Sequence, residues 1–270
     1  MNYLTLEQIQ HEELNLLIAL TTFLEENGLK YSLHSGTLLG AVRHGGFIPW
    51  DDDVDISMPR PDYERFLSRC AELPNNLFVI NSDNSEFPYR FTKVCTRDVR
   101  AQQDVYENVF EEYLWVDVFP IDGLPASEEE QTRLFKSVLL NKRLANYCVF
   151  NHKTAHSRFG KIIAYCYRVL PGRKTRRDRL NAKFKRLIES YPFESSEFMT
   201  TTLSSDSNHL WVWRKDDYCD WGRIDFCGHS FMVYSNPEKL LTHCYKDYMQ
   251  LPPKEERRTH EMKCWRVNSN

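Results

Sequence analysis

Long apolar runs are missing from this chain. No stretch of about eighteen apolar residues, the length that crosses a bilayer, occurs in it. The opening residues, MNYLTLEQIQHEEL, also lack the basic start and the apolar core of a secretory signal. We therefore expect a cytoplasmic protein rather than a secreted or membrane-spanning one.

Closely paired cysteines are missing as well. The eight cysteines are scattered and form no C-x-x-C pair, which suits reduced thiols better than a disulfide framework. A zinc site from Cys219, Cys227, His229 and either His243 or Cys244 is an open alternative to partly buried cysteines. Glycine and proline are not in excess, and repeats and low-complexity tracts are absent, so we expect a folded globular protein.

Acidic residues are nearly absent from one segment. Residues 131–188 hold 16 of the 35 Lys and Arg residues but a single acid, Asp178, so the segment carries about +15 and the rest of the chain about −18. Such a separation favours an anionic partner. We expect the inner face of the plasma membrane rather than nucleic acid, because few aromatic residues interleave with the basic ones. A solvated helical face that balances the acidic remainder is the open alternative.

The remaining pattern mixes helices and strands. Thr5 and Gln8 have the capping-box spacing at the start of a long amphipathic helix, which Asn27-Gly28 should end. From Ser127 onward apolar residues recur at helical spacing. We expect strands over 31–34, 54–58, 77–80, 89–95, about 99–105, 114–119 (stopped by Pro120) and within 218–234, and further helices over 61–70, 178–190 and 237–245.

These elements predict the α+β class, with a mixed central sheet flanked by helices and an inserted helical subdomain. We expect a core over residues 1–126, a basic helical subdomain over 127–192, and a segment over 193–270 that completes the core.

Four aspartates crowd into five residues at Asp51-Asp52-Asp53-Val54-Asp55. If the run enters a strand, Asp51, Asp53 and Asp55 share one face, and Asp52 points the other way with Val54. Two carboxylates about 4 Å apart repel by about 4 kcal/mol at an effective dielectric constant of about 20. A hard divalent cation is the usual answer to such repulsion. A solvated acidic loop is the alternative.

A small-residue turn precedes the acidic run. The segment Gly36-Thr37-Leu38-Leu39-Gly40 stands where a strand should pass into a helix, and its free backbone N–H groups and the Thr37 hydroxyl could face a phosphate. It is neither a Walker loop nor a GxGxxG motif, and on its own it indicates little.

Together, the turn and the acidic run resemble the signature of the nucleotidyltransferase superfamily. In that superfamily a strand carrying Asp-hydrophobic-Asp-hydrophobic follows the Gly-Ser/Thr turn, as Asp53 to Ile56 do here. A third acid belongs to a later, adjacent strand, and Val116-Asp117-Val118 matches it. The resemblance implies three carboxylates around one or two metal ions that bridge phosphate oxygens.

Three blocks resemble the LicD family more narrowly, a family that includes the fukutin-related proteins. They are HSGTLLGAVRHGGFIPWDDDVDISMPRPDYERF, then WVDVFPIDGLP, and the C-terminal HCYKDYMQLPPKEERRTH, in which Lys246 replaces the usual glycine. The resemblance implies a phosphotransferase that moves a phospho-alkyl unit from CDP-choline or CDP-ribitol to a hydroxyl of a glycan. Typical acceptors are precursors of teichoic acid or lipopolysaccharide and glycoprotein glycans.

Residue roles follow from the matched positions. The resemblance implies Mg²⁺, or Mn²⁺, held by Asp53 and Asp55 with Asp51 nearby, while Asp117 either completes the metal site or accepts the proton of the acceptor hydroxyl. Asp122 is either a loop cap or a catalyst. The expected nucleotide- and phosphate-binding residues are Gly36, Thr37, Gly40, Arg43, His44 and Lys93.

Aromatic side chains could surround a quaternary ammonium group by cation–π contact. Trp50 and Tyr248 are the main candidates, and Tyr89, Trp115 and Trp221 are others, with core packing as the alternative for each.

Three other functions stay open. The same acids would serve a nucleotidyltransferase that moves NMP from an NTP to a small molecule. A non-catalytic module that binds a membrane surface would use the basic segment, and a glycosyltransferase with a DxD motif is the weakest alternative.

Overall fold

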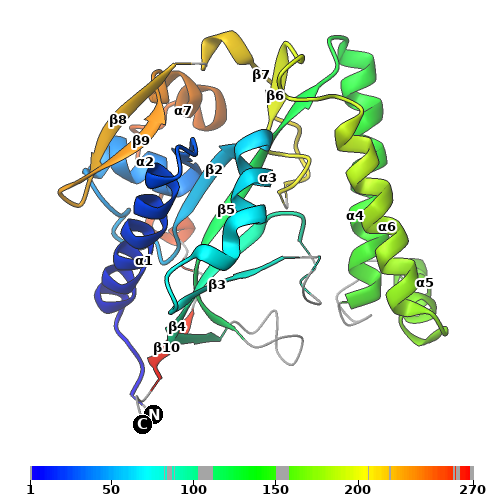
Figure 1. Cartoon of the computed structure of the whole chain (residues 1–270), viewed down its shortest axis with the longest axis horizontal. Coiled ribbons are helices and arrows are strands. Elements are labelled where there is room, and N and C mark those ends of the chain that lie inside the picture. The colour runs from blue at the N-terminus through cyan, green and yellow to red at the C-terminus, as the bar shows by residue number, and fades with distance from the viewer. Residues whose placement is uncertain are drawn as a thin grey trace. The chain divides into compact units, whose positions relative to one another are not determined.

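The computed structural model describes residues 2–102 except 82, 84–86 and 88, residues 112–149, 158–205, 207–257 except 219, residue 259 and residues 262–267. The chain folds into two compact units (Figure 1). Unit 1 contains residues 1–80, 92–120 and 216–270, and unit 2 contains residues 81–91 and 121–215. The helical subdomain predicted over 127–192 lies within unit 2, while the units divide the chain elsewhere than at 126 and 192.

Unit 1 begins with helix α1, Leu6–Glu26. The predicted capping box is present, because Thr5 Oγ1 accepts from the Gln8 N–H at 3.3 Å and Gln8 Oε1 accepts from the Thr5 N–H at 2.9 Å. Helix α1 ends at Asn27, as predicted, and Gly28 follows with φ 62°. Its buried face includes Ile9, Glu13, Leu16, Leu17, Leu20 and Leu24.

The sheet of unit 1 has the strand order β1-β2-β5-β4, with β3 and β10 on the free edge of β4. Strand β1 is antiparallel to β2, and β4 is antiparallel to β3, β5 and β10. Ile9 of α1 packs in one apolar cluster with Val99 of β4, Trp115 of β5 and Cys264 of β10. The strand bounds are Ser32–Leu33 (β1), Asp55–Pro59 (β2), Leu77–Ile80 (β3), Thr92–Gln102 (β4), Tyr113–Leu124 (β5) and Lys263–Arg266 (β10).

Two strand predictions are wrong. The strands expected over 89–95 and 99–105 are one strand, β4, whose register with β5 shifts between Cys95 and Arg100; residues 103–105 lie outside the described residues. Pro120 does not stop β5. Its missing N–H costs nothing in these ladders, because the pairing with β4 ends at Val118 and the pairing with β6 begins at Asp122.

The alternation of apolar and polar residues over 54–58 is typical of a half-buried strand, but the structure differs from that pattern. Strand β2 forms there, but all five of its residues are buried, because it is an inner strand between β1 and β5. The helices that accompany the sheet are α2 (Ser35–His44), α3 (Arg60–Arg69) and α7 (Pro237–Tyr245).

A two-stranded hairpin, β8 (Trp221–Phe226) with β9 (His229–Tyr234), completes unit 1. Cys227 and Gly228 form its turn with φ values of 55° and 78°, the type I′ geometry that suits a two-residue hairpin loop. The N–H of Cys227 donates to the Gly45 carbonyl at 2.8 Å, so the hairpin is tied to the end of α2.

Lys246, which follows α7, has φ 57° and ψ −109°, a combination that disfavours any residue with a Cβ. We expect Lys246→Gly to raise the free energy of unfolding by about 1 kcal/mol, after allowance for the greater unfolded-state freedom of glycine. Urea denaturation measures the change. Lys246→Ala is the control, since alanine keeps the Cβ; equal stabilities of the two variants would contradict the strain.

Unit 2 contains the three helices α4, α5 and α6, and α4 lies beside α6 along most of its length (Figure 1). Its core includes Leu134, Val138, Phe184 and Ile188. Helix α6 begins at Arg173, five residues before the predicted start. The bounds are Glu128–Val149 (α4), Arg158–Val169 (α5), Arg173–Glu189 (α6), Phe198–Thr200 (β6) and Trp213–Arg214 (β7).

Asp122 lies in unit 2, where it is fully buried and accepts a hydrogen bond from the Ser204 hydroxyl at 2.9 Å. Helices that combine the length and the low polarity needed to cross a bilayer do not occur among the described residues. The predicted α+β class is confirmed by the mixture of helices with a many-stranded sheet.

Candidate active site

The first turn of α2 is joined directly to the acidic run, and both lie in unit 1. Thr37 Oγ1 accepts a hydrogen bond from the Asp55 N–H at 2.8 Å, which places the start of β2 against the start of α2. A Cβ at Gly36 would lie 2.7 Å from Asp51 Oδ2, so only glycine allows that carboxylate to approach the turn. Ser35, at the start of α2, has φ 49°, an uncommon value for a residue other than glycine.

Gly40 has a packing role in this arrangement. A Cβ there would lie 2.4 Å from the Gly46 carbonyl oxygen and 3.2 Å from the Ile48 nitrogen. The absence of a side chain at Gly40 therefore lets the segment after α2 fold back along the helix and return the chain toward Asp51.

The sequence had suggested that the aspartates lie along a strand. In the structure they do not all do so. Strand β2 begins at Asp55, and Asp51 and Asp53 precede it with partly exposed side chains. Asp52 is turned away and buried, as expected, and its Oδ2 accepts the Met262 N–H at 3.4 Å. The run therefore separates into three carboxylates that are available to the candidate site, Asp51, Asp53 and Asp55, and one with a structural role, Asp52.

The third acid stands on the strand next to β2. The Asp117 N–H of β5 donates to the Val54 carbonyl at 2.9 Å. Across the other edge of β5, Asp117 is paired with Lys93 of β4, and Lys93 Nζ lies 3.6 Å from Asp117 Oδ1. The ammonium also lies 3.2 Å from the centre of the Trp115 ring. The predicted adjacency of Asp117 to the acidic strand is thus present.

Electrostatics show that these carboxylates share one region. Burial raises the pKa of Asp55 well above its usual value, and the charges of Asp53, Asp117 and Asp51 raise it further, while Lys93 lowers it. The charges of Asp53, Asp117 and Asp51 therefore make Asp55 harder to ionise. A cluster of this kind is stabilised by added positive charge.

The donor set suits a hard divalent cation of the Mg²⁺ type. Among the described residues, no three His, Cys, Asp or Glu side chains converge to hold an ion by themselves. Mg²⁺ is usually held by only one or two carboxylates, together with waters and substrate phosphates. The carboxylate oxygens of Asp51, Asp53, Asp55 and Asp117 fit that arrangement, because the charges of the other three act on Asp55 and raise its pKa.

Arg43 and His44 lie in the last turn of α2, at the opposite end from Ser35. Arg43 donates from Nη1 to the Tyr248 carbonyl at 2.8 Å and from Nε to His44 Nε2 at 3.0 Å. These contacts attach the segment after α7 to α2. A role in phosphate binding for either residue stays a prediction.

Three of the five aromatic candidates already have a protein cation over the ring. The guanidinium of Arg257 lies 4.6 Å from the centre of Trp50, Lys93 covers Trp115, and Lys30 lies 5.9 Å from the centre of Trp221. Tyr248 is partly exposed, and Tyr89 belongs to unit 2. Of the two main candidates, Trp50 therefore has a protein cation over its ring. Tyr248 is in none of the cation–π pairs found among the described residues.

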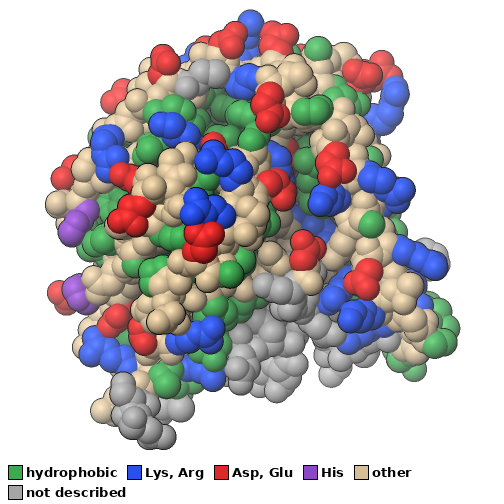
Figure 2. Space-filling view, in the orientation of Figure 1, with side chains coloured by type: hydrophobic (Ala, Val, Ile, Leu, Met, Phe, Trp, Pro, Cys, Tyr) green, Lys and Arg blue, Asp and Glu red, His purple; other side chains and the backbone are tan. Residues whose placement is uncertain are grey.

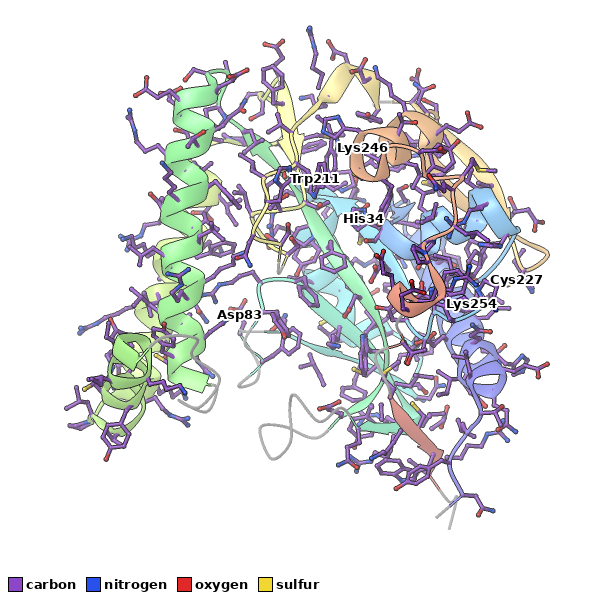
Figure 3. All side chains as sticks on the ribbon, turned by 180° about the vertical axis from the view of Figure 1, so that it is seen from behind. His34, Asp83, Trp211, Cys227, Lys246 and Lys254 are labelled. Atoms are coloured by element: carbon purple, nitrogen blue, oxygen red, sulfur yellow. The ribbon has the colours of Figure 1, made fainter. Side chains whose placement is uncertain are left out.

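Sequence reasoning missed Tyr245, at the end of α7. Its hydroxyl lies 3.4 Å from the hydroxyl of Ser35 at the start of α2, 210 positions away in the chain. Figure 3 labels His34, immediately before α2, and Lys246, immediately after α7, which mark these two segments. Burial lowers the pKa of His34 to about 4, so its imidazole is neutral at pH 7. Tyr245 belongs to the C-terminal block HCYKDYMQLPPKEERRTH, and the resemblance of that block to the LicD family is the signal that could have identified it.

Sequence reasoning also missed Glu13, although its spacing from Ile9 and Leu17 places it on the apolar face of α1. Glu13 is fully buried, and neither carboxylate oxygen has a hydrogen-bond partner among the described residues. Burial raises its pKa well above the usual value, and the charges of Asp53, Asp52, Asp51 and Asp55 add to the rise. A buried fifth acid, Glu13, thus lies near the aspartate run.

We expect Glu13→Met to raise the free energy of unfolding at pH 7 by about 2 kcal/mol, because it removes an unsatisfied buried carboxyl group. Folded Glu13 keeps its proton to a higher pH than unfolded Glu13, so it costs stability as pH rises from about 4.5 through its folded pKa. The variant should lose that part of the pH dependence. Urea titrations from pH 4 to 8 measure it, with exposed Glu7→Met as the control; the same pH slope in both variants would contradict the assignment.

One ligand of the zinc alternative, Cys219, lies outside the described residues, so the complete site stays a prediction. Among the described residues, Cys227 is in the β8–β9 turn, and no group of three suitable ligands forms.

Comparisons with known proteins relate the chain to one family. Residues 28–161 match the family described as LicD/FKTN/FKRP, nucleotidyltransferase domain. The chain is 27% identical over 274 residues to the lipopolysaccharide cholinephosphotransferase LicD of Haemophilus influenzae, a match that covers 97% of this chain and 98% of that protein. It is 46% identical over 50 residues to the human ribitol 5-phosphate transferase FKRP, which is 18% of this chain and 9% of that protein.

A third relative, an uncharacterized protein of Rickettsia prowazekii, is 33% identical over 104 residues, 32% of this chain and 38% of that protein. The family match begins just before the small-residue turn and includes the acidic run, Lys93 and Asp117. The family match covers the turn and the acids, and one relative is similar over nearly the whole chain. This protein therefore belongs to the LicD family of transferases.

Proposed function

We propose that this protein transfers a phospho-alkyl group, of the phosphocholine or phosphoribitol type, from a CDP-linked donor to a hydroxyl of a cell-surface glycan precursor. One observation carries the proposal. The phosphate turn at Ser35–Thr37, the acidic run and Asp117 are held together by direct contacts, in a chain alike over 97% of its length to a lipopolysaccharide cholinephosphotransferase.

The proposed reaction is an in-line displacement at phosphorus. The acceptor oxygen forms a bond to the phosphorus that carries the alkyl alcohol, and the bond from that phosphorus to the bridging oxygen breaks, so CMP leaves. The acceptor hydroxyl gives up its proton. The product is a phosphodiester between the alcohol and the glycan.

Asp51, Asp53, Asp55 and Asp117 would hold one or two Mg²⁺ or Mn²⁺ ions. When bound, such ions neutralise phosphate charge and favour the displacement. The N–H groups of the first turn of α2 suit a phosphate oxygen. The Thr37 hydroxyl already accepts a hydrogen bond from the Asp55 N–H, so it holds the start of β2 against the turn. Gly36 leaves room for the Asp51 carboxylate, and Gly40 leaves room for the segment after α2.

Asp117 and Lys93 would act as a pair in this reaction. The Lys93 ammonium, 3.6 Å from Asp117 Oδ1, keeps a positive charge beside the carboxylate. Asp117 serves either as a ligand of the ion or as the acceptor of the hydroxyl proton, and both roles stay in the proposal. A cytoplasmic location at the inner face of the plasma membrane stays a prediction.

The test is a donor screen. The purified protein is incubated with Mg²⁺, an acceptor glycolipid and either CDP-choline or CDP-ribitol, and CMP and modified glycolipid are measured. We expect CMP release that depends on both the acceptor and the metal, and that chelation with EDTA abolishes. The control is the same reaction with NTPs, in which pyrophosphate is measured.

Pyrophosphate from an NTP, without CMP from any cytidine donor, would replace this proposal with a nucleotidyltransferase that acts on a small molecule. No turnover with either donor class, together with unchanged cellular function of an Asp53→Ala/Asp55→Ala variant, would indicate a non-catalytic module.

A further inference from the structure

Helix α5 of unit 2 exposes an apolar stripe. Ile162, Tyr165 and Val169 are 61%, 53% and 55% exposed, and Cys166 between them is exposed as well. At about 100° per residue these four side chains fall within an arc of about 100° on one side of the helix. Leu170, just beyond the helix, is 54% exposed. Four of the ten exposed large hydrophobic residues in the described chain therefore lie within nine positions.

The outward direction of this stripe is fixed by the packing of unit 2. Ile163 and Tyr167 lie on a different side of α5 and are partly buried, and the Tyr167 ring is 6.5 Å from that of Tyr147 in α4. Arg176 of α6 donates from Nη2 to the carbonyls of Tyr167 and Leu170 at 2.8 Å each. These bonds hold the end of α5 to α6, so the stripe is exposed although the helix itself is anchored.

Exposed basic residues lie on α5 and on the helix next to it. Lys161 precedes Ile162, and the neighbouring helix α6 exposes Lys174, Arg179 and Lys183. Figure 2 shows green side chains gathered at the lower right, over α5 in the orientation of Figure 1, with blue Lys and Arg side chains near them. The sequence from 131 to 188 contains one acid, Asp178, so little negative charge offsets these cations.

We propose that α5 is an interfacial membrane helix, which lays its stripe among the headgroups and outer acyl segments of an anionic bilayer while the nearby Lys and Arg residues contact lipid phosphates. An apolar stripe with a basic border is the pattern of helices that lie in the membrane plane. At 12 residues, about 18 Å long, α5 is too short to span a bilayer.

Other occupants fit the same surface less well. A second copy of this chain would bring a segment of about +15 against another of the same sign. Nucleic acid would meet the basic residues, but the stripe offers two aliphatic side chains, a cysteine and one tyrosine rather than a row of aromatic rings for bases to stack on. An apolar stripe contributes to binding only where the partner has an apolar layer, and a bilayer has one.

The experiment measures binding of the full chain to vesicles of phosphatidylcholine with and without about 30% phosphatidylglycerol, at low and high salt. We expect binding to the anionic vesicles that salt weakens. Ile162→Ser/Val169→Ser should reduce the partition coefficient roughly tenfold or more, since it removes apolar area without a change of charge. The matched control is Tyr3→Ser/Leu140→Ser, which removes two side chains of similar exposure, 54% and 56%, and should bind as the unaltered protein does.

A second measurement does not depend on any substitution. Amide hydrogen exchange over residues 161–170 should slow when anionic vesicles are added, and exchange over the β8–β9 hairpin should not change. Equal binding of the stripe variant and the unaltered protein would overturn the proposal, because binding would then be electrostatic only. Absence of vesicle binding, or displacement from vesicles by an equimolar oligonucleotide, would overturn it as well.

Discussion

Asp55→Asn is expected to lower kcat by roughly a thousandfold while the folded protein becomes more stable without metal. The carboxylate is 9% exposed and stands at the start of β2, where the first turn of α2 and Asp117 meet. Removal of its charge takes away a ligand of the proposed ion and the negative charge that Asp53, Asp117 and Asp51 oppose. The free energy of unfolding should rise by about 1 kcal/mol or more at pH 7.

The free energy of unfolding should depend on pH through Asp55. The pKa of Asp55 is higher in the folded protein than in the unfolded chain, so the folded protein binds the extra proton and its stability falls as pH rises from about 4 through the folded pKa. Asp55→Asn should flatten this fall. Turnover of CDP-choline and urea denaturation across pH 4 to 8 measure the two effects.

Asp52→Asn is the matched control, because Asp52 belongs to the same run and is buried but accepts the backbone N–H of Met262 instead. An asparagine oxygen can accept the same bond, so we expect near-normal turnover. Equal loss of activity in the two variants would show that the whole run acts as one charge and would contradict the separation of Asp52 from the site.

Lys93→Met is expected to destabilise the protein by about 3 kcal/mol and to abolish turnover. The ammonium is 5% exposed, lies against Asp117 and the Trp115 ring, and lowers the pKa of Asp55. Without it, the buried carboxylates of Asp55 and Asp117 would lose the positive charge that Lys93 supplies, and loss of one member of a buried pair is far costlier than removal of the whole pair. Urea denaturation measures the loss, and bound Mg²⁺ should recover part of it.

A double variant separates charge from packing. Lys93→Met/Asp117→Asn should regain most of the lost stability, though not the activity, because it removes both members of the pair. Lys30→Met is the control, since Lys30 also lies over a tryptophan, Trp221, but is exposed and should change stability little. If the double variant were no more stable than Lys93→Met, the loss would come from packing and not from charge.

Local signals in the sequence were sufficient for the parts of the fold that depend on neighbouring residues. The capping box of Thr5 and Gln8 and the stop at Asn27-Gly28 set both ends of α1. The same holds for α7 and for β3, whose observed bounds equal the predicted ones. Caps, turns and side-chain periodicity act within a few residues, so they can be interpreted without the rest of the chain.

The main errors in the predicted secondary structure concern where strands end. Pro120 was expected to stop β5, but whether a missing N–H matters depends on which partner strand lies opposite, and that partner, Phe198–Thr200, comes some eighty residues later. The same reasoning explains β4: its register shift is decided by β5 and not by its own residues.

By itself, the sequence determined which residues could do chemistry here: a run of acids after a small-residue turn, and one acid on a later strand. Only the tertiary structure decided what surrounds them, because burial and charge neighbours are set by segments far apart in the chain. It placed Lys93 beside Asp117, Tyr245 beside Ser35, Arg257 over Trp50 and the unsatisfied Glu13 near the aspartates. A carboxylate's type can be read from the chain, but its pKa depends on its neighbours in space.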